Sequence, residues 1–156
     1  MLRSILLSIH VLSVIVWLGC GLYELFLARE LKLARGTALE LHYARMYLKY
    51  AAPVPVATIL VALTGVLMAL FLDWGFFQYL WLGTKQALML GVLTIFASIV
   101  PAFLRFKSAV ESLPAETEQL PTENARQFDA LEPWLITMRI MGTVAVVLAV
   151  FRPELL

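Results

Sequence analysis

Four long apolar stretches, separated by shorter polar ones, dominate the chain. Residues 4–23, 51–72 and 86–104 carry no formal charge, and residues 133–151 carry only Arg139. Each stretch is close to the ~20 residues that cross the hydrocarbon core of a bilayer as a helix. We therefore predict a single all-α integral membrane domain over residues 1–156, a four-helix transmembrane bundle with helices at about 2–28, 51–72, 80–107 and 133–151.

The two longer polar connections, at about 29–50 and 108–132, carry signals of their own. Thr37 followed by Glu40 has the spacing of a capping box, which predicts that a helix starts at Thr37. Three tyrosines then recur on one side of that helix, and such rings favour the lipid headgroup layer: Tyr43, Tyr47 and Tyr50. We expect the second connection to be partly helical, around residues 123–131.

Lysine and arginine counts predict the orientation in the membrane. The first and third connections face the same side and hold Arg29, Lys32, Arg35, Arg45, Lys49, Arg105, Lys107 and Arg126. The opposite side holds Arg3 and Arg152, with Lys85 just inside the third predicted helix. By the positive-inside rule, both connections at 29–50 and 108–132 are cytoplasmic and both termini face outside.

Composition supports the membrane assignment and excludes several other classes. The chain is 62% hydrophobic and 15% charged, whereas soluble domains are roughly 45–50% apolar and about 25% charged. Its net charge of +1, without a basic stripe interleaved with aromatic residues, argues against nucleic acid as a partner. Because Cys20 is the only cysteine, an intrachain disulfide and a CxxC metal site are excluded. The lipid bilayer is the partner that composition predicts.

A stripe of polar and small residues runs along the first apolar stretch. Its members recur roughly every 3.5 residues and therefore share one helix face: His10, Ser13, Trp17, Gly21 and Glu24. Ionisable groups are costly on a lipid-facing surface, so this face is expected to point into the bundle. At ~1.5 Å per residue, His10 lies ~10 Å below the outer surface, and Glu24 lies toward the cytoplasmic end.

Glu24 and Arg139 are expected to form an ion pair, since both lie toward the cytoplasmic end of their helices. An arginine near the centre of a transmembrane helix costs roughly 2.5–3.5 kcal/mol on insertion scales, so it calls for a partner. The pair can be a structural latch between the first and last helices. Alternatively, it can serve a proton path or anchor an anionic ligand.

His10 is the candidate ligand of a haem iron or of copper, although a buried imidazole can also be satisfied by a serine or a backbone carbonyl. A haem in a helical bundle needs an axial ligand, an apolar pocket and cations for its propionates. His10 can supply the ligand, Trp17 a wall of the pocket and Lys85 the cation. Met68 or Met89 can take the sixth position, or simply fill the core.

Lys85 and the sulfur atoms each have an alternative interpretation. Near a helix end, Lys85 can extend to the interface; held inward, it offers a positive charge to a carboxylate. One imidazole with methionine and cysteine sulfur suits Cu(I), which keeps copper handling as an alternative.

Several of these residues resemble a group of small bacterial membrane proteins. The segment IHVLSVIVWLGCGLYELFLA resembles the first helix of HemJ-type protoporphyrinogen oxidases, copper-resistance protein D (CopD) proteins and related uncharacterised four-helix proteins. WLGTK, ALEP and FRPEL resemble further segments of the HemJ type. The resemblance implies a bacterial inner (plasma) membrane location, bound haem b, His10 as its ligand and Lys85 as a functional, catalytic residue.

The leading hypothesis is a membrane haem b-binding redox protein that acts on a porphyrinogen or a quinone. The second is a non-enzymatic accessory subunit or assembly factor, with residues 108–130 as a docking surface. The third is a copper-handling membrane protein. A homodimer or a larger membrane complex is compatible with each, and a dimer could supply a second histidine to a haem.

Overall fold

The described residues of the computed structural model, 1–71, 76–77, 79–114 and 116–151, form helices and no strand. The helices of this part of the chain are α1 (Leu2–Leu33), α2 (Glu40–Ala51), α3 (Val54–Phe71), α4 (Leu80–Glu111) and α5 (Thr122–Phe151). Residue 72, Arg152 and most of the FRPEL segment, which entered the sequence analysis, lie outside the described residues.

Within the described residues, four helical segments are long and apolar enough to cross a membrane: α1, α2 with α3, α4 and α5. Each has 30 or 32 residues. At ~1.5 Å per residue such a helix exceeds the ~30 Å hydrocarbon core, so its ends extend beyond that core. The predicted all-α four-helix bundle is confirmed.

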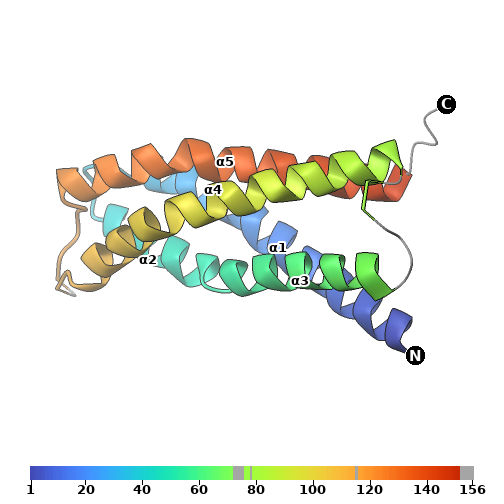
Figure 1. Ribbon diagram of the computed structural model, residues 1–156. Coiled ribbons are helices and arrows are strands. Elements are labelled where there is room, and N and C mark those ends of the chain that lie inside the picture. The colour runs from blue at the N-terminus through green and yellow to red at the C-terminus, as the bar shows by residue number, and fades with distance from the viewer. Residues whose placement is uncertain (72–75, 78, 115, 152–156) are drawn as a thin grey trace.

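The bundle consists of two closely packed groups of helices (Figure 1). Helix α1 packs along α2 and α3, and α4 packs along α5. Smaller contacts of α1 with α5 and of α2 with α4 join the groups. Helix α1 begins and α5 ends at the same end of the bundle, as an even number of crossings requires.

Three helices are longer than the sequence predicted, and the connection between the last two of them is shorter. Helix α1 continues to Leu33. Helix α4 continues to Glu111, and α5 begins at Thr122 instead of near Pro133. The prediction was wrong at Pro133 because the polar turns before it bury Asn124, Phe128 and Leu131 and so are stabilised by packing. Proline removes one backbone donor, which a long and well-packed helix tolerates.

The predicted helix start at Thr37 is wrong, because α2 begins at Glu40, although the Thr37 hydroxyl accepts a hydrogen bond from the Leu39 N–H at 3.3 Å. The Thr37 hydroxyl donates to the Ala34 carbonyl at 2.6 Å, closing the turn that follows α1. Gly36 adopts a φ of +73° in this turn, and its N–H donates to the Glu40 carboxylate at 3.0 Å. Both side chains therefore stabilise the turn, and α2 begins at Glu40.

The hydrophobic core is richest toward the end of the bundle that holds α2. Large side chains that are almost completely buried there come from α1, α2, α4 and α5, among them Leu31, Tyr47, Phe106 and Phe128. The ring of Tyr47 meets that of Phe128 edge to face, with centroids 5.1 Å apart. Tyr47 is thus a core residue, contrary to the expected headgroup position, because its ring packs against Phe128 of α5.

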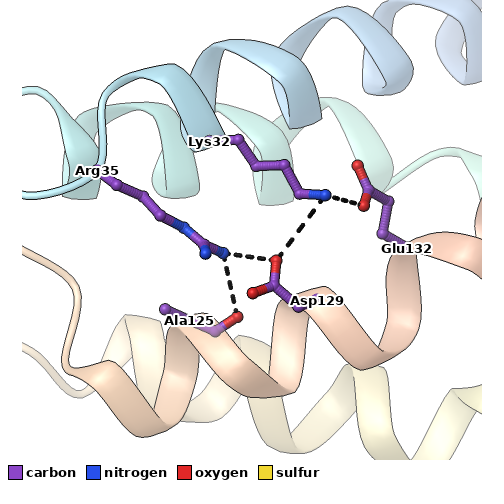
Figure 2. A network of polar contacts seen from close by, with 5 residues as sticks. All are labelled: Lys32, Arg35, Ala125, Asp129 and Glu132. Carbon is purple, nitrogen blue, oxygen red and sulfur yellow. Dashed lines mark hydrogen bonds and ion pairs between the residues drawn. The ribbon is translucent and has the colours of Figure 1, made fainter.

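Charged side chains connect α1 and α5 at this end (Figure 2). Lys32 forms an ion pair with Glu132, and the Arg35 guanidinium donates to the Asp129 carboxylate at 2.5 Å. The hydrogen bond to Asp129 raises the pKa of the Arg35 guanidinium above its ordinary value. Because the pairs are solvent-exposed, each contributes only about 0–1 kcal/mol and serves mainly to align the two helices.

Glycines set how closely α1 and α5 approach where they cross. A Cβ atom added to Gly142 on α5 would overlap the indole ring of Trp17 on α1. One added to Gly21 would overlap the Arg139 guanidinium. Both glycines therefore leave room for a large side chain from the other helix.

We predict that Gly142→Ala destabilises the protein by about 1–3 kcal/mol, since the methyl group overpacks the crossing against Trp17. The matched control is Gly19→Ala, because no heavy atom outside its own helix lies within 4 Å of an added Cβ there. The control should not lose stability, since alanine is the better helix former. Unfolding in mixed micelles measures the stability of both variants. If Gly142→Ala were as stable as Gly19→Ala, the close approach of α5 to Trp17 would be contradicted.

Candidate functional site

The α1 stripe points into the bundle, as its periodicity predicts. Ser13, Trp17, Gly21 and Glu24 are buried, and His10 is partly buried. Two polar centres lie along this face, one around Glu24 and the other around His10. Different helices complete them: α5 faces the Glu24 centre, and α3 faces His10.

The centre around Glu24, which we call the inner centre, is built around the Arg139 guanidinium. It forms an ion pair with Glu24, and the two side chains are only 5% and 6% exposed. Nη1 of Arg139 donates to the Trp17 carbonyl at 3.5 Å, and the guanidinium carbon Cζ lies 4.8 Å from the centroid of the Trp17 ring. Gly21 leaves the space that the guanidinium occupies. Arg139 is therefore held by three successive turns of α1.

This arrangement changes the expected role of Trp17. We expected its ring to wall a cofactor pocket next to His10, but the ring packs on Arg139 and Gly142. A cation over an indole ring is attracted by the ring quadrupole, more strongly when both are desolvated. Trp17 thus belongs with Glu24 to the latch between α1 and α5. Within the described residues, Nε of Arg139 has no hydrogen-bond partner.

The centre around His10, which we call the outer centre, is formed by His10 and Thr64. Thr64 was not among the residues expected at this site. Nδ1 of His10 lies 2.8 Å from the Thr64 hydroxyl oxygen. That hydroxyl lies 2.5 Å from the Leu60 carbonyl, one turn earlier on α3, to which it donates. A hydroxyl has one proton, so the Thr64 oxygen accepts a hydrogen bond from His10.

The hydrogen bonds of Thr64 favour one tautomer of His10. In this tautomer Nδ1 carries the proton and donates it to the Thr64 oxygen. Nε2 is then the unprotonated nitrogen, with a lone pair available to a ligand or a proton. A hydroxyl followed by Gly65 within an otherwise apolar stretch was the signal in the sequence that could have indicated Thr64.

The other predicted site residues lie on two helices, Met68 on α3 and Lys85 and Met89 on α4. Lys85 is partly buried near the start of α4. Met68 is almost completely buried one turn beyond Thr64 on α3. Met89 is partly buried one turn beyond Lys85 on α4.

Metal binding by side chains alone has little support in the part of the chain that the structure describes. No group of three or more histidine, cysteine, aspartate or glutamate side chains there could hold a metal ion. Cys20 is partly buried, and its thiol forms no disulfide. A haem does not need such a cluster, because the porphyrin supplies four nitrogens and the protein only axial ligands.

We predict that Glu24→Gln lowers the free energy of unfolding by about 3–5 kcal/mol, because it leaves the Arg139 charge buried and uncompensated. Glu30→Gln is the matched control on the same helix, since Glu30 forms no ion pair within the described residues. Adding Arg139→Gln to Glu24→Gln should recover part of the loss. If Glu24→Gln were as stable as Glu30→Gln, the ion pair would not act as a latch between α1 and α5.

Comparisons with known proteins do not assign an identity to these two centres. No protein family, curated protein or solved structure that was compared matches the chain. The chemistry of the two centres therefore has to be judged from the residues that form them.

Proposed function

We propose that this protein is a membrane haem b-binding redox protein in which Nε2 of His10 is the axial ligand. The observation that carries the proposal is the hydrogen bond between Nδ1 and Thr64, whose own proton is committed to Leu60. Ligating histidines almost always donate their other ring N–H to a nearby acceptor, which orients the ring and raises its basicity. His10 has that arrangement before any ligand is bound.

The residues around His10 fit the chemical needs of a haem. The segments that carry His10 and Thr64 are mostly apolar, as the walls of a haem pocket must be, and Met68 or Met89 would offer a thioether for the sixth position. The cation Lys85, on α4, would meet a propionate or the carboxylate of a substrate. A bound haem would supply one-electron transfer, and a porphyrinogen or a quinone is the proposed electron partner.

The protein's own residues would position this chemistry. Thr64 holds the imidazole plane, and Lys85 places the carboxylate of the bound partner. The Glu24–Arg139 pair acts only indirectly, by fixing α1 against α5. The resemblance of residues 9–28 and 81–85 to HemJ-type proteins is consistent with this division of roles, and we extend the proposal to membership of that group.

We predict a Soret band in the visible spectrum of detergent-purified protein when haem is supplied during expression. His10→Ala should abolish it, whereas His42→Ala should not, because His42 is exposed on α2. Thr64→Val removes the acceptor for Nδ1 while keeping the side-chain volume, and should weaken haem binding roughly 10–100-fold.

The outcomes of this experiment separate the three hypotheses. Absence of a Soret band despite haem supply overturns the proposal, as does a band that His10→Ala leaves unchanged. Stoichiometric copper in the purified protein would favour copper handling. Co-purification of a partner that His10→Ala weakens, without any change in the spectrum, would favour an accessory subunit.

We also propose that the membrane is the bacterial inner membrane and that α1 begins and α5 ends on its outer side. The excess of lysine and arginine in the connections supports this orientation. In a Cys20→Ser background, we predict that Ser4→Cys in intact spheroplasts reacts with a membrane-impermeant maleimide. Gly36→Cys, in the turn after α1, should react only after permeabilisation. The reverse pattern would contradict the orientation.

A further inference from the structure

Gly65, the residue after Thr64 on α3, leaves room beside the imidazole of His10. A Cβ atom added to Gly65 would lie 3.7 Å from Cε1 of His10, an ordinary van der Waals distance. Apart from α3's own backbone and the adjoining residues, no other heavy atom of the described part of the chain would lie within 4 Å of that Cβ. Gly65 is itself only partly buried. The position thus borders the imidazole edge and is otherwise open.

Three other glycines leave room that a large side chain from a neighbouring helix fills. The pairs are Gly21 with Arg139, Gly142 with Trp17 and Gly91 with Met141. In each pair an added Cβ would overlap that side chain, so these glycines serve the packing of helices. Packing does not account for Gly65 in the same way, although glycine is a poorer helix former than alanine. A glycine that weakens its helix without serving packing is expected to serve the group that it borders, His10.

The open position lies near the ring nitrogen of His10 that does not bind Thr64. Cε1 is bonded to both ring nitrogens, and Nδ1 is the one that lies 2.8 Å from the Thr64 hydroxyl oxygen. Because a ring C–N bond is about 1.3 Å long, Nε2 lies within about 5 Å of the position that a Cβ at residue 65 would take. A side chain longer than a methyl group at this position can therefore reach the surroundings of Nε2.

We propose that Gly65 determines which ligands reach His10, because the absence of a side chain there admits a broad planar ring system such as a porphyrin to Nε2. A porphyrin extends well beyond its metal on every side, so the residues beside an axial nitrogen must leave it room. A proton or a water molecule has no such need. The inference rests on the proposed function and adds a specificity-determining residue to the outer centre: Thr64 orients the imidazole, and Gly65 keeps its Nε2 side open.

The rate at which diethyl pyrocarbonate modifies His10 in haem-free protein, purified in detergent, tests this inference without haem. The reagent acylates an unprotonated imidazole nitrogen, and peptide mass spectrometry distinguishes His10 from His42. His42 is exposed on α2 and provides an internal reference in every variant. We predict that Gly65→Leu slows the modification of His10 relative to His42 at least about tenfold, whereas Gly65→Ala slows it less than about twofold, since its methyl group only contacts Cε1.

The same variants are expected to differ in haem binding. Gly65→Leu should weaken it at least about tenfold, and Gly65→Ala should retain it. Gly65→Val should show intermediate effects in both measurements, and it replaces Gly65→Leu if the larger side chain lowers the thermal midpoint. Gly19→Leu is the matched control, because Gly19 is exposed on α1 and an added Cβ there meets no heavy atom within 4 Å. It should change neither measurement.

Equal modification rates of His10 in Gly65→Leu and Gly19→Leu overturn the inference, as does a wild-type His10 that the reagent does not reach. Equal haem affinities of these two variants also overturn it and leave the proposed function intact. If Gly65→Leu slows the modification but the wild-type protein shows no Soret band, the haem proposal fails, and control of access to His10 by Gly65 stands. The two failures are therefore distinguishable.

Discussion

The ion pair between Arg139 and Glu24 is the interaction on which the arrangement of this bundle depends. A single charge inside an apolar helix is costly, so Arg139 can be accommodated only where another helix supplies a carboxylate. α1 supplies it, together with the Trp17 ring and carbonyl. Gly21 and Gly142 allow the helices to approach closely enough for these contacts. The pairing of charges thus selects which face of α5 meets α1.

The latch also separates the two polar centres along α1. Near Glu24, α1 is committed to α5, and the large core residues of α2, α4 and α5 gather toward the same end. Around His10, α1 is paired with α3 through Thr64. The imidazole is only partly buried there. The Glu24 end of this helix face is therefore filled by protein, whereas the His10 end is less enclosed.

Much of this could be predicted from the sequence, because lipid imposes a simple rule. Long uncharged stretches must be helical to satisfy their backbone groups, and costly groups must point inward. The stripe on α1 and the pairing of Glu24 with Arg139 follow from that rule. Helical turns around residues 123–131 were also expected, but their continuity with the last membrane helix was not, because Pro133 lies between them and packing of Phe128 and Leu131 holds the polar turns. The helix start predicted at Thr37 was wrong because Thr37 and Glu40 bind the preceding turn.

The sequence by itself determined that this is a helical membrane protein with an interior face on its first helix, since hydropathy and periodicity are local properties. The tertiary structure decided what each residue of that face does. It placed the Trp17 ring against Arg139, and it supplied Thr64 from α3 as the partner that favours one tautomer of His10. Trp17 and Arg139 are separated by 122 positions in the chain, and His10 and Thr64 by 54 positions. Only the packing of helices brings such residues together.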